Sequence, residues 1–228
     1  MDQNAVLLED MRVGKLFKAG YSLARSFLDA LQWPWEAIPL IASYVKELGA
    51  QLDESEYEAR PGNVWIHRSA DIAPTAYIGS DIIIGADVFV AHCAYIRGPA
   101  IVGEGAVVGN STEIKNVILF DGVQVPHFNY VGDSILGYKA HFGAGVITSN
   151  VKSDSSLVSV RCCDECIETG LKKFGAIIGD GVEVGCNAVL NPGTVIGAQS
   201  TVYPLSMVRG FIPGNSIYKK QGEIVEKR

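Results

Sequence analysis

An apolar residue recurs at every sixth position through most of this sequence, and few folds accommodate that spacing. The first nine positions are all Ile or Val, and the register then slips twice before the spacing resumes after an interruption. The positions are Ile66, Ile72, Ile78, Ile84, Val90, Ile96, Val102, Val108 and Ile114, then Leu119, Val125, Val131, Leu136 and Phe142, and finally Ile178, Val184, Leu190, Ile196, Val202 and Val208.

A period of six fits neither the 3.6 residues of a helical turn nor the alternation of an isolated strand. It fits a coil with flat faces and repeated corners, in which the branched residue points inward and stacks on its equivalents. A glycine often follows, as at Gly79 and Gly85, and relieves the tight corner. Burying each inward side chain contributes roughly 1.5–3 kcal/mol. The sequence therefore predicts a mainly β protein with a hexapeptide-repeat parallel β-helix over residues 61–213.

Residues 1–60 lie outside the repeat and are predicted to form an α-helical N-terminal segment with an acidic linker. Pro34 would separate two helices, because proline breaks a helix or begins one. The two expected apolar faces are Leu23, Phe27 and Leu31, and Ile38, Ile41, Val45 and Leu48. One role for this segment is to cover the open end of the coil, where strand edges are unpaired.

Two further regions interrupt or follow the coil. Residues 151–175 are predicted to be an insertion between coils, and such excursions commonly lie at functional edges. Residues 214–228 are predicted to be a tail that leaves the coil and ends in a short charged helix.

Composition excludes several classes of protein. The formal net charge of −6 gives no general attraction to nucleic acid or to an anionic membrane. No apolar run reaches the roughly 18 residues of a membrane span, and the acidic start does not resemble a signal peptide, so we expect a cytoplasmic protein. The five cysteines are expected to be thiols in a reducing compartment.

Two stretches carry the polar chemistry. GNSTEIKN places Glu113 and Lys115 on either side of inward Ile114, so both should point outward, where a surface salt pair between them is the plain alternative. VPHFNYVGD places His127 ahead of Tyr130. A histidine can carry a proton near neutral pH, although a lone histidine is more often structural.

Together, GNSTEIKN, VPHFNYVGDSILG, FGAGVITSN and KKFGAIIGDGVEVGCNAVLNPGTVIG resemble the acetyltransferase domain of bifunctional enzymes that make UDP-N-acetylglucosamine, in particular archaeal sugar-1-phosphate nucleotidyltransferase/acetyltransferases. The resemblance covers approximately residues 64–213. It implies a left-handed β-helix and transfer of an acetyl group from acetyl-CoA to an amino-sugar 1-phosphate. It also implies a homotrimer with sites between subunits.

The resemblance also implies residue roles. His127 aligns with the catalytic base, and Asn150 with a further catalytic residue. The expected substrate-binding residues are Arg97, Glu113, Lys115, Tyr130 and Lys173, and the expected acetyl-CoA-binding residues are His141, Ala144, Cys186 and Pro204. No metal is expected. His141 and Cys186 depart from the bacterial pattern, which has asparagine and serine there. Ser156 and Ser159 replace archaeal-type lysines, which puts sugar specificity in doubt.

The chemistry agrees with these roles. An ammonium group cannot attack a thioester, so the sugar amine must first lose a proton, which a neutral imidazole can accept. Such general base catalysis contributes about 10²–10⁴ in rate. Arg97, Lys115 and Lys173 would supply the positive charge that binds a phosphate.

Several alternatives remain. No glycine-rich nucleotidyltransferase signature precedes the coil, so we expect no pyrophosphorylase activity, and the helical segment could instead dock a separate nucleotidyltransferase. A non-catalytic sugar-phosphate-binding scaffold would keep the cations without turnover. A zinc site is a further alternative, either in the cluster of Cys162, Cys163 and Cys166, which lacks a second pair, or among the four histidines, which lack a close H-x₄-H pair.

Overall fold

The computed structural model describes residues 8–18, 20–162 and 165–227. Its helical elements are α2 (Val13–Leu16), α3 (Arg25–Asp29), the 3₁₀ helix η1 (Pro34–Leu40) and α4 (Ile41–Gly49). Its strands are β1 (Tyr57–Arg60), β2 (Val64–His67), β3 (Asp71–Ile72), β4 (Tyr77–Ile78), β5 (Ile82–Ile84), β6 (Phe89–Val90), β7 (Tyr95–Ile96), β8 (Ala100–Val102), β9 (Val107–Asn110), β10 (Glu113–Leu119), β11 (Gln124–His127), β12 (Tyr130–Leu136), β13 (His141–Phe142), β14 (Ile147–Thr148), β15 (Ser159–Cys162), β16 (Glu165–Glu168), β17 (Ala176–Ile178), β18 (Glu183–Val184), β19 (Val189–Leu190), β20 (Thr194–Ile196), β21 (Thr201–Val202), β22 (Met207–Val208), β23 (Phe211–Ile212), β24 (Ser216–Lys220) and β25 (Glu223–Glu226).

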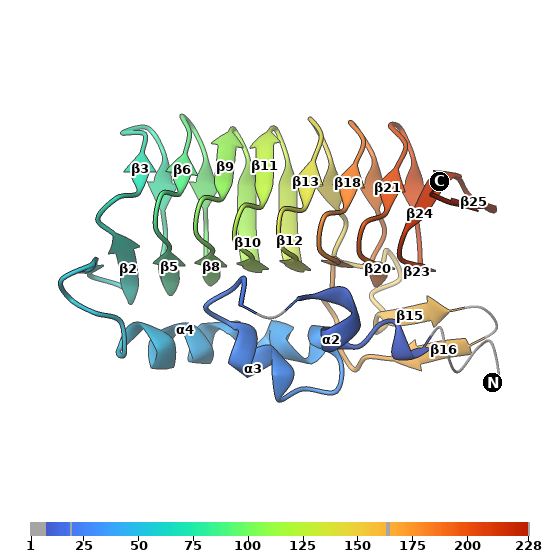
Figure 1. The fold of residues 1–228 in the computed structure, drawn as a ribbon, viewed down its shortest axis with the longest axis horizontal. Helices are drawn as coiled ribbons and strands as arrows, with labels where there is room; N and C mark the ends of the chain where they lie inside the picture. The colour runs from blue at the N-terminus through green and yellow to red at the C-terminus, as the bar shows by residue number, and fades with distance from the viewer. Residues whose placement is uncertain (1–7, 19, 163–164, 228) are drawn as a thin grey trace.

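The predicted stack of branched residues is confirmed by the parallel strand register, which builds a β-solenoid with three faces (Figure 1). The first face comprises β2, β5, β8, the later halves of β10 and β12, β17, β20 and β23. The second face comprises β3, β6, β9, β11, β13, β18, β21 and β24. The third face comprises β4, β7, the early halves of β10 and β12, β14, β19 and β22. One inward column on the first face runs through Ile66, Ile84, Val102, Leu119, Leu136, Ile178, Ile196 and Ile212.

The slips in the six-residue register have a structural cause at the corner between the third and first faces. β10 and β12 run straight through this corner, so β10 pairs with β7 on one side of it and with β8 on the other. Asn116 and Asp133 make the corner with φ angles of 54° and 49°. One residue in the left-handed conformation therefore turns the chain, and these two coils are shorter than their neighbours.

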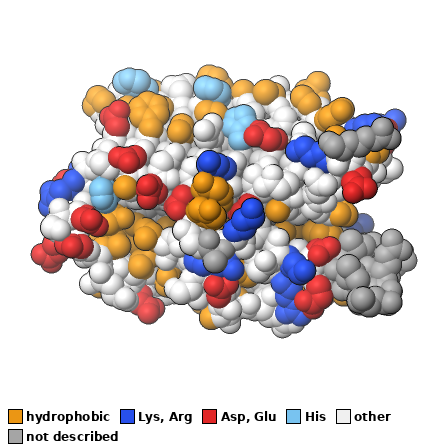
Figure 2. Space-filling model, viewed as in Figure 1, with side chains coloured by type: hydrophobic (Ala, Val, Ile, Leu, Met, Phe, Trp, Pro, Cys, Tyr) orange, Lys and Arg blue, Asp and Glu red, His pale blue; other side chains and the backbone are white. Residues whose placement is uncertain are grey.

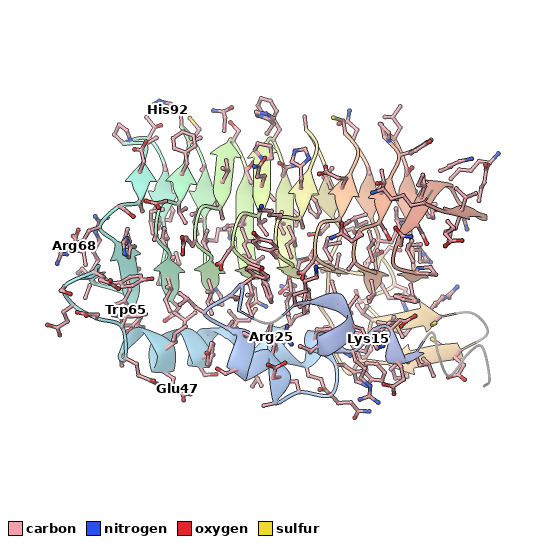
Figure 3. The ribbon with its side chains drawn as sticks, viewed as in Figure 1. Lys15, Arg25, Glu47, Trp65, Arg68 and His92 are labelled. Carbon is pink, nitrogen blue, oxygen red and sulfur yellow. The ribbon has the colours of Figure 1, made fainter. Side chains whose placement is uncertain are left out.

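The N-terminal helices cover the first face of the coil instead of its open end, so the capping role, one of the two that the sequence left open, is wrong. Outward residues on this face are apolar and stack in register as Trp65, Ile83, Ile101, Ile118, Ile135, Ile177, Val195 and Phe211. α4 packs on β5, β8 and β10, and η1 packs on β12 (Figure 1). Trp65 lies between β2 and α4 (Figure 3), where a Cβ at Gly49 would come within 2.4 Å of its ring. The docking of a separate nucleotidyltransferase stays a prediction.

The two expected apolar helix faces fare differently. Ile38, Ile41 and Val45 are buried, as expected. In the earlier segment the expected face is confirmed only in part, because Phe27 and Leu31 pack partly buried against the core, whereas Leu23 is 38% exposed and Leu28 is fully buried in its place. α3 is a single short turn preceded by non-helical residues, so helical spacing from Leu23 does not hold.

The insertion and the tail both form hairpins. Within the insertion, β15 and β16 pair antiparallel beside the solenoid. The tail does not leave the coil or end in a helix, because β24 pairs parallel with β21 and β25 returns antiparallel to β24. No described helix combines the length and apolar character that crossing a membrane requires.

Candidate active site

His127 belongs to a column of residues at the corner between the second and third faces, which we call the His127 corner. The residue after each member has positive φ, and in four successive coils its amide donates to the carbonyl of the preceding member at 2.8–3.0 Å. The column is His92, Asn110, His127, Ala144, Cys186 and Pro204. Three of the four expected acetyl-CoA-binding residues therefore stack directly behind the expected base.

The His127 turn is fixed by a buried asparagine. The His127 amide donates to Oδ1 of Asn129 at 3.1 Å, and Asn129 Nδ2 donates to the carbonyl of Gly143 at 2.8 Å. The His127 side chain itself is exposed. Histidine side chains recur along the upper edge of the molecule in Figure 2, and Figure 3 labels His92 on the same edge. The imidazole is thus anchored through its backbone and open to a ligand.

His141 is not part of this column. It lies on the second face, where it pairs in register with Gln124 and Glu183. Its Nδ1 lies 2.7 Å from Oε2 of Glu183. The structure therefore places His141 beside the column, with its ring already bound to a carboxylate.

Tyr130 crosses the third face to reach Asn150 on the far edge. Asn150 Nδ2 donates to the Tyr130 hydroxyl at 3.2 Å. The ring lies over Gly132, where an added Cβ would come within 2.6 Å of the hydroxyl oxygen. Burial raises the pKa of Tyr130 above its usual value, so the phenol stays protonated as a hydrogen-bond donor.

The far edge of the third face is organised by Asp133, which sequence reasoning missed. Its carboxylate accepts hydrogen bonds from Lys115 Nζ at 3.0 and 3.1 Å, from Asn116 Nδ2 at 2.8 Å and from Asn150 Nδ2. The slip in the repeat at this corner is the sequence signal that could have found it.

Glu113 and Lys115 both point outward, as predicted, but they do not pair with each other. Glu113 Oε1 instead accepts a hydrogen bond from Arg97 Nη1 at 2.8 Å, because Arg97 lies one coil away on the same face. Each of these cations is thereby held by a carboxylate from a neighbouring coil.

Lys173 reaches this edge from the insertion. The amide of the next residue, Phe174, donates to the carbonyl of Asn150 at 3.0 Å, which places the Lys173 backbone beside Asn150. The Lys173 side chain is exposed. The structure thus brings together Arg97, Glu113, Lys115, Tyr130, Asn150 and Lys173 on the third face, with His127 at its opposite edge.

Cys93, Cys166 and Cys186 are free thiols, whereas Cys163 lies outside the described residues. Among the residues that the structure describes, no group of three or more His, Cys, Asp or Glu side chains is placed to hold a metal ion.

This architecture places the chain among the hexapeptide-repeat β-solenoid proteins. Comparisons with known proteins then identify its relatives. No family model matches the chain. The chain is 37% identical over 120 residues to the "Bifunctional protein GlmU" of Methanococcus maripaludis strain C7, covering 52% of this chain and 29% of that protein. It is 35% identical over 109 residues to the "Bifunctional sugar-1-phosphate nucleotidylyltransferase/acetyltransferase" of Sulfurisphaera tokodaii, covering 48% of this chain and 27% of that protein.

The chain is therefore a homologue of these bifunctional proteins over about half of its length, and it spans less than a third of theirs. Among solved structures, the polySia-specific acetyltransferase NeuO overlaps 69% of this chain and 80% of its own at 14% identity, with a TM-score of 0.47. The strand register, rather than this overlap, establishes the fold.

Proposed function

We propose that this protein is an acetyl-CoA-dependent N-acetyltransferase that acts on an amino-sugar 1-phosphate and uses His127 as general base. The observation that carries the proposal is the His127 corner, because one exposed imidazole stands in the same column as Ala144, Cys186 and Pro204. The homology to GlmU-type proteins supports the reaction class. The positive-φ residues at successive corners are consistent with a left-handed coil, which we include in the proposal.

In this reaction the imidazole of His127 accepts a proton from the sugar ammonium group. The resulting amine attacks the thioester carbonyl carbon, a C–N bond forms, and the C–S bond breaks as the tetrahedral intermediate collapses. The leaving thiolate of coenzyme A takes up the second proton lost by the attacking nitrogen, and the proton held by His127 passes to solvent, so the products are the N-acetyl sugar phosphate, the free thiol and one released proton.

Phosphate binding falls to the cations of the third face. Asp133 holds Lys115, and Glu113 holds Arg97, so both cations are positioned before the substrate arrives. An arginine can grip two phosphate oxygens through its planar fork, while Lys173 can add a mobile charge from the insertion.

Asn150 is proposed to act by positioning. Its Nδ2 group already donates to the Tyr130 hydroxyl and to Asp133, which occupies both of its protons. The Tyr130 hydroxyl, kept protonated by its raised pKa, then has its own proton available for the substrate. This geometry favours Tyr130 as the group that touches the ligand and Asn150 as the group that fixes its ring.

We further propose that the protein assembles as a homotrimer through the second and third faces. The N-terminal segment already covers the first face. Large apolar side chains are exposed instead on the other two faces and at the His127 corner, among them Tyr77 at 60%, Phe128 at 62% and Leu205 at 80%. Exposed apolar area of this kind is typical of a protein interface. In such a trimer, His127 would face acetyl-CoA held partly by a neighbouring chain.

The test is acetyl transfer from acetyl-CoA to a panel of amino-sugar 1-phosphates, followed by the mass of the N-acetyl product so that protein thiols do not interfere. His127→Ala is compared with His92→Ala, which removes an exposed imidazole from the same corner two coils earlier. We expect a rate loss of about 10²-fold or more in His127→Ala alone. Retained turnover in that variant would overturn the base assignment.

Other outcomes bear on the substrate and the assembly. If no panel member is acetylated although acetyl-CoA binds, an amino-sugar 1-phosphate is excluded as the acceptor. If acetyl-CoA does not bind either, a sugar-phosphate scaffold is favoured. For the trimer, light scattering should give a mass near three chains, and Leu205→Asp should lower it. A monomeric wild-type protein at micromolar concentration would overturn the trimer.

A further inference from the structure

A basic pocket lies between the insertion hairpin and the last coils, on the edge of the third face away from His127. It has a volume of about 320 Å³. Its walls are Ser149, Val151, Lys152, Ser153, Asp154, Ser159, Arg161, Asn191, Pro192 and Arg209. We propose that this pocket binds the phosphates of a nucleoside diphosphate group.

Two glycines of the solenoid seat the hairpin and thereby build the pocket. Gly193 and Gly210 have φ angles of 79° and 78°, a conformation that other residues rarely adopt. A Cβ on Gly193 would come within 2.5 Å of the Ser159 carbonyl oxygen, and a Cβ on Gly210 within 2.7 Å of the Arg161 carbonyl oxygen. β15 therefore lies directly against the corner that carries Arg209, and both arginines line one pocket.

The pocket carries unneutralised positive charge. In the described part of the chain, Lys152, Arg161 and Arg209 form no ion pair, and Lys152 Nζ donates only to the Leu157 carbonyl, at 3.3 Å. The single acid in the wall, Asp154, accepts from the amide and hydroxyl of Ser156 at 3.0 and 2.7 Å. Three cations against one acid leave this hollow with a formal charge of +2 in a protein of net charge −6, which favours a multiply charged oxyanion.

A second hollow beside the first provides room for a ligand larger than phosphate. It has a volume of about 420 Å³ and shares Arg161 and Arg209 with the first. Its other walls are Met207, Phe211, Ile212, Tyr218, Gln221, Gly222 and Ile224, most of which are apolar. A ligand that spans both hollows would place its phosphates at the two arginines and a flat, partly apolar group against the aromatic and aliphatic side chains of the second hollow. A nucleoside diphosphate has this build, whether it is free, part of a nucleotide sugar or part of coenzyme A.

The two hollows are separate from the residues assigned to acetyl transfer. The arginines lie across the third face from the His127 corner, and no residue proposed above to touch the amino sugar or the acetyl group lines either hollow. Binding can therefore be measured without the acetyl donor or acceptor.

The test is calorimetric titration of the full-length protein with ADP, UDP, coenzyme A and inorganic phosphate at low ionic strength. Arg161 and Arg209 are both exposed. Their alanine variants, Arg161→Ala and Arg209→Ala, should therefore fold normally. The matched control is Arg68→Ala, an exposed arginine that lines neither hollow. We expect about a tenfold or greater loss of ADP or UDP affinity in each pocket variant, because a hydrogen bond to a charged group is lost. The control should bind as the wild type does.

The arms distinguish the sources of the diphosphate. Binding of coenzyme A alone, lost in the pocket variants, would support the site and identify the coenzyme as its ligand. Binding of ADP or UDP, lost in the same variants, would support it with a free nucleotide or nucleotide sugar. Inorganic phosphate binding as tightly as ADP would overturn the nucleoside part. Equal affinities in wild type and Arg161→Ala/Arg209→Ala, or no binding of any probe, would overturn the site.

Discussion

The carboxylate of Asp133 lies 3.0 Å from the ammonium nitrogen of Lys115, and the Asp133 side chain is only 3% exposed. Lys115 retains 20% exposure, so it is held from one side and open to a ligand from the other. Because Asp133 also accepts from Asn150, one buried acid positions a phosphate-binding cation and the amide that orients Tyr130.

Asp133→Asn should therefore damage the site as a unit. Asparagine tolerates the positive φ of this corner, so the chain can still turn. The loss of the charge leaves Lys115 without its partner, which costs up to about 3–5 kcal/mol where both members of a pair are buried. We expect turnover to fall by up to about 100-fold through misplaced groups. Glu47→Gln, on the exposed side of α4, serves as the control, and equal kinetics in the two variants would contradict this role.

Gly132→Ala should weaken binding of the sugar phosphate while the protein still folds. Its Cβ would come within 2.6 Å of the Tyr130 hydroxyl and 2.9 Å of Asn150 Nδ2, so the phenol must move off Asn150. We expect KM for the sugar phosphate to rise about tenfold, as for a lost hydrogen bond to a charged group. Gly14→Ala is matched, because no atom lies within 4 Å of the Cβ it would add. Steady-state kinetics of both variants check this, and an unchanged KM in Gly132→Ala would show that Tyr130 does not contact the substrate.

The position of the N-terminal segment could have been predicted from the strands themselves. The runs Ile82–Ile84 and Ala176–Ile178 are apolar at outward as well as inward positions, which is typical of strands buried on both faces. The six-residue repeat reports only the inward residues, so it predicts the coil and says nothing of what covers it.

The candidate site was predictable only in part, for a different reason. Residues at equivalent corners, such as His127 and Ala144, stack because the repeat is regular. The Asp133 hub depends on a corner that the repeat skips. The pairing of Arg161 with Arg209 around one pocket depends on how an insertion docks onto Gly193 and Gly210, and no local pattern encodes that contact.

Leu28→Ala, within α3, and Leu23→Ala, just before it, test which of these leucines belongs to the core. Leu28 is fully buried, so its truncation should lower the free energy of unfolding by about 2–5 kcal/mol. Leu23 is 38% exposed, so the same change there should stay within about 0.5 kcal/mol. Urea unfolding at fixed protein concentration measures both. A larger cost at Leu23 would restore the face expected from helical spacing.

Asp180 should make stability depend on pH through the contact between the N-terminal segment and the coil. Its carboxylate accepts from the amides of Lys18 at 2.6 Å and Tyr138 at 2.8 Å. Burial raises the pKa of this group above its ordinary value of 3.8, and the hydrogen bonds from the two backbone amides only partly oppose that rise.

The sign follows from proton linkage. Between pH 3.8 and the higher pKa of the folded state, the native protein binds more protons at this site than the unfolded chain does. The contribution of Asp180 to stability is therefore greatest below this window, falls as pH rises through it, and is constant above. Asp180→Asn removes the titration, so the stability of wild type minus that of the variant should decline with pH across the window. Thermal unfolding of both proteins from pH 3 to 8 checks this, with Asp71→Asn at an exposed site as control. If the stability difference between wild type and Asp180→Asn instead rises with pH, the hydrogen bonds from the two amides outweigh burial and the pKa of Asp180 is lowered.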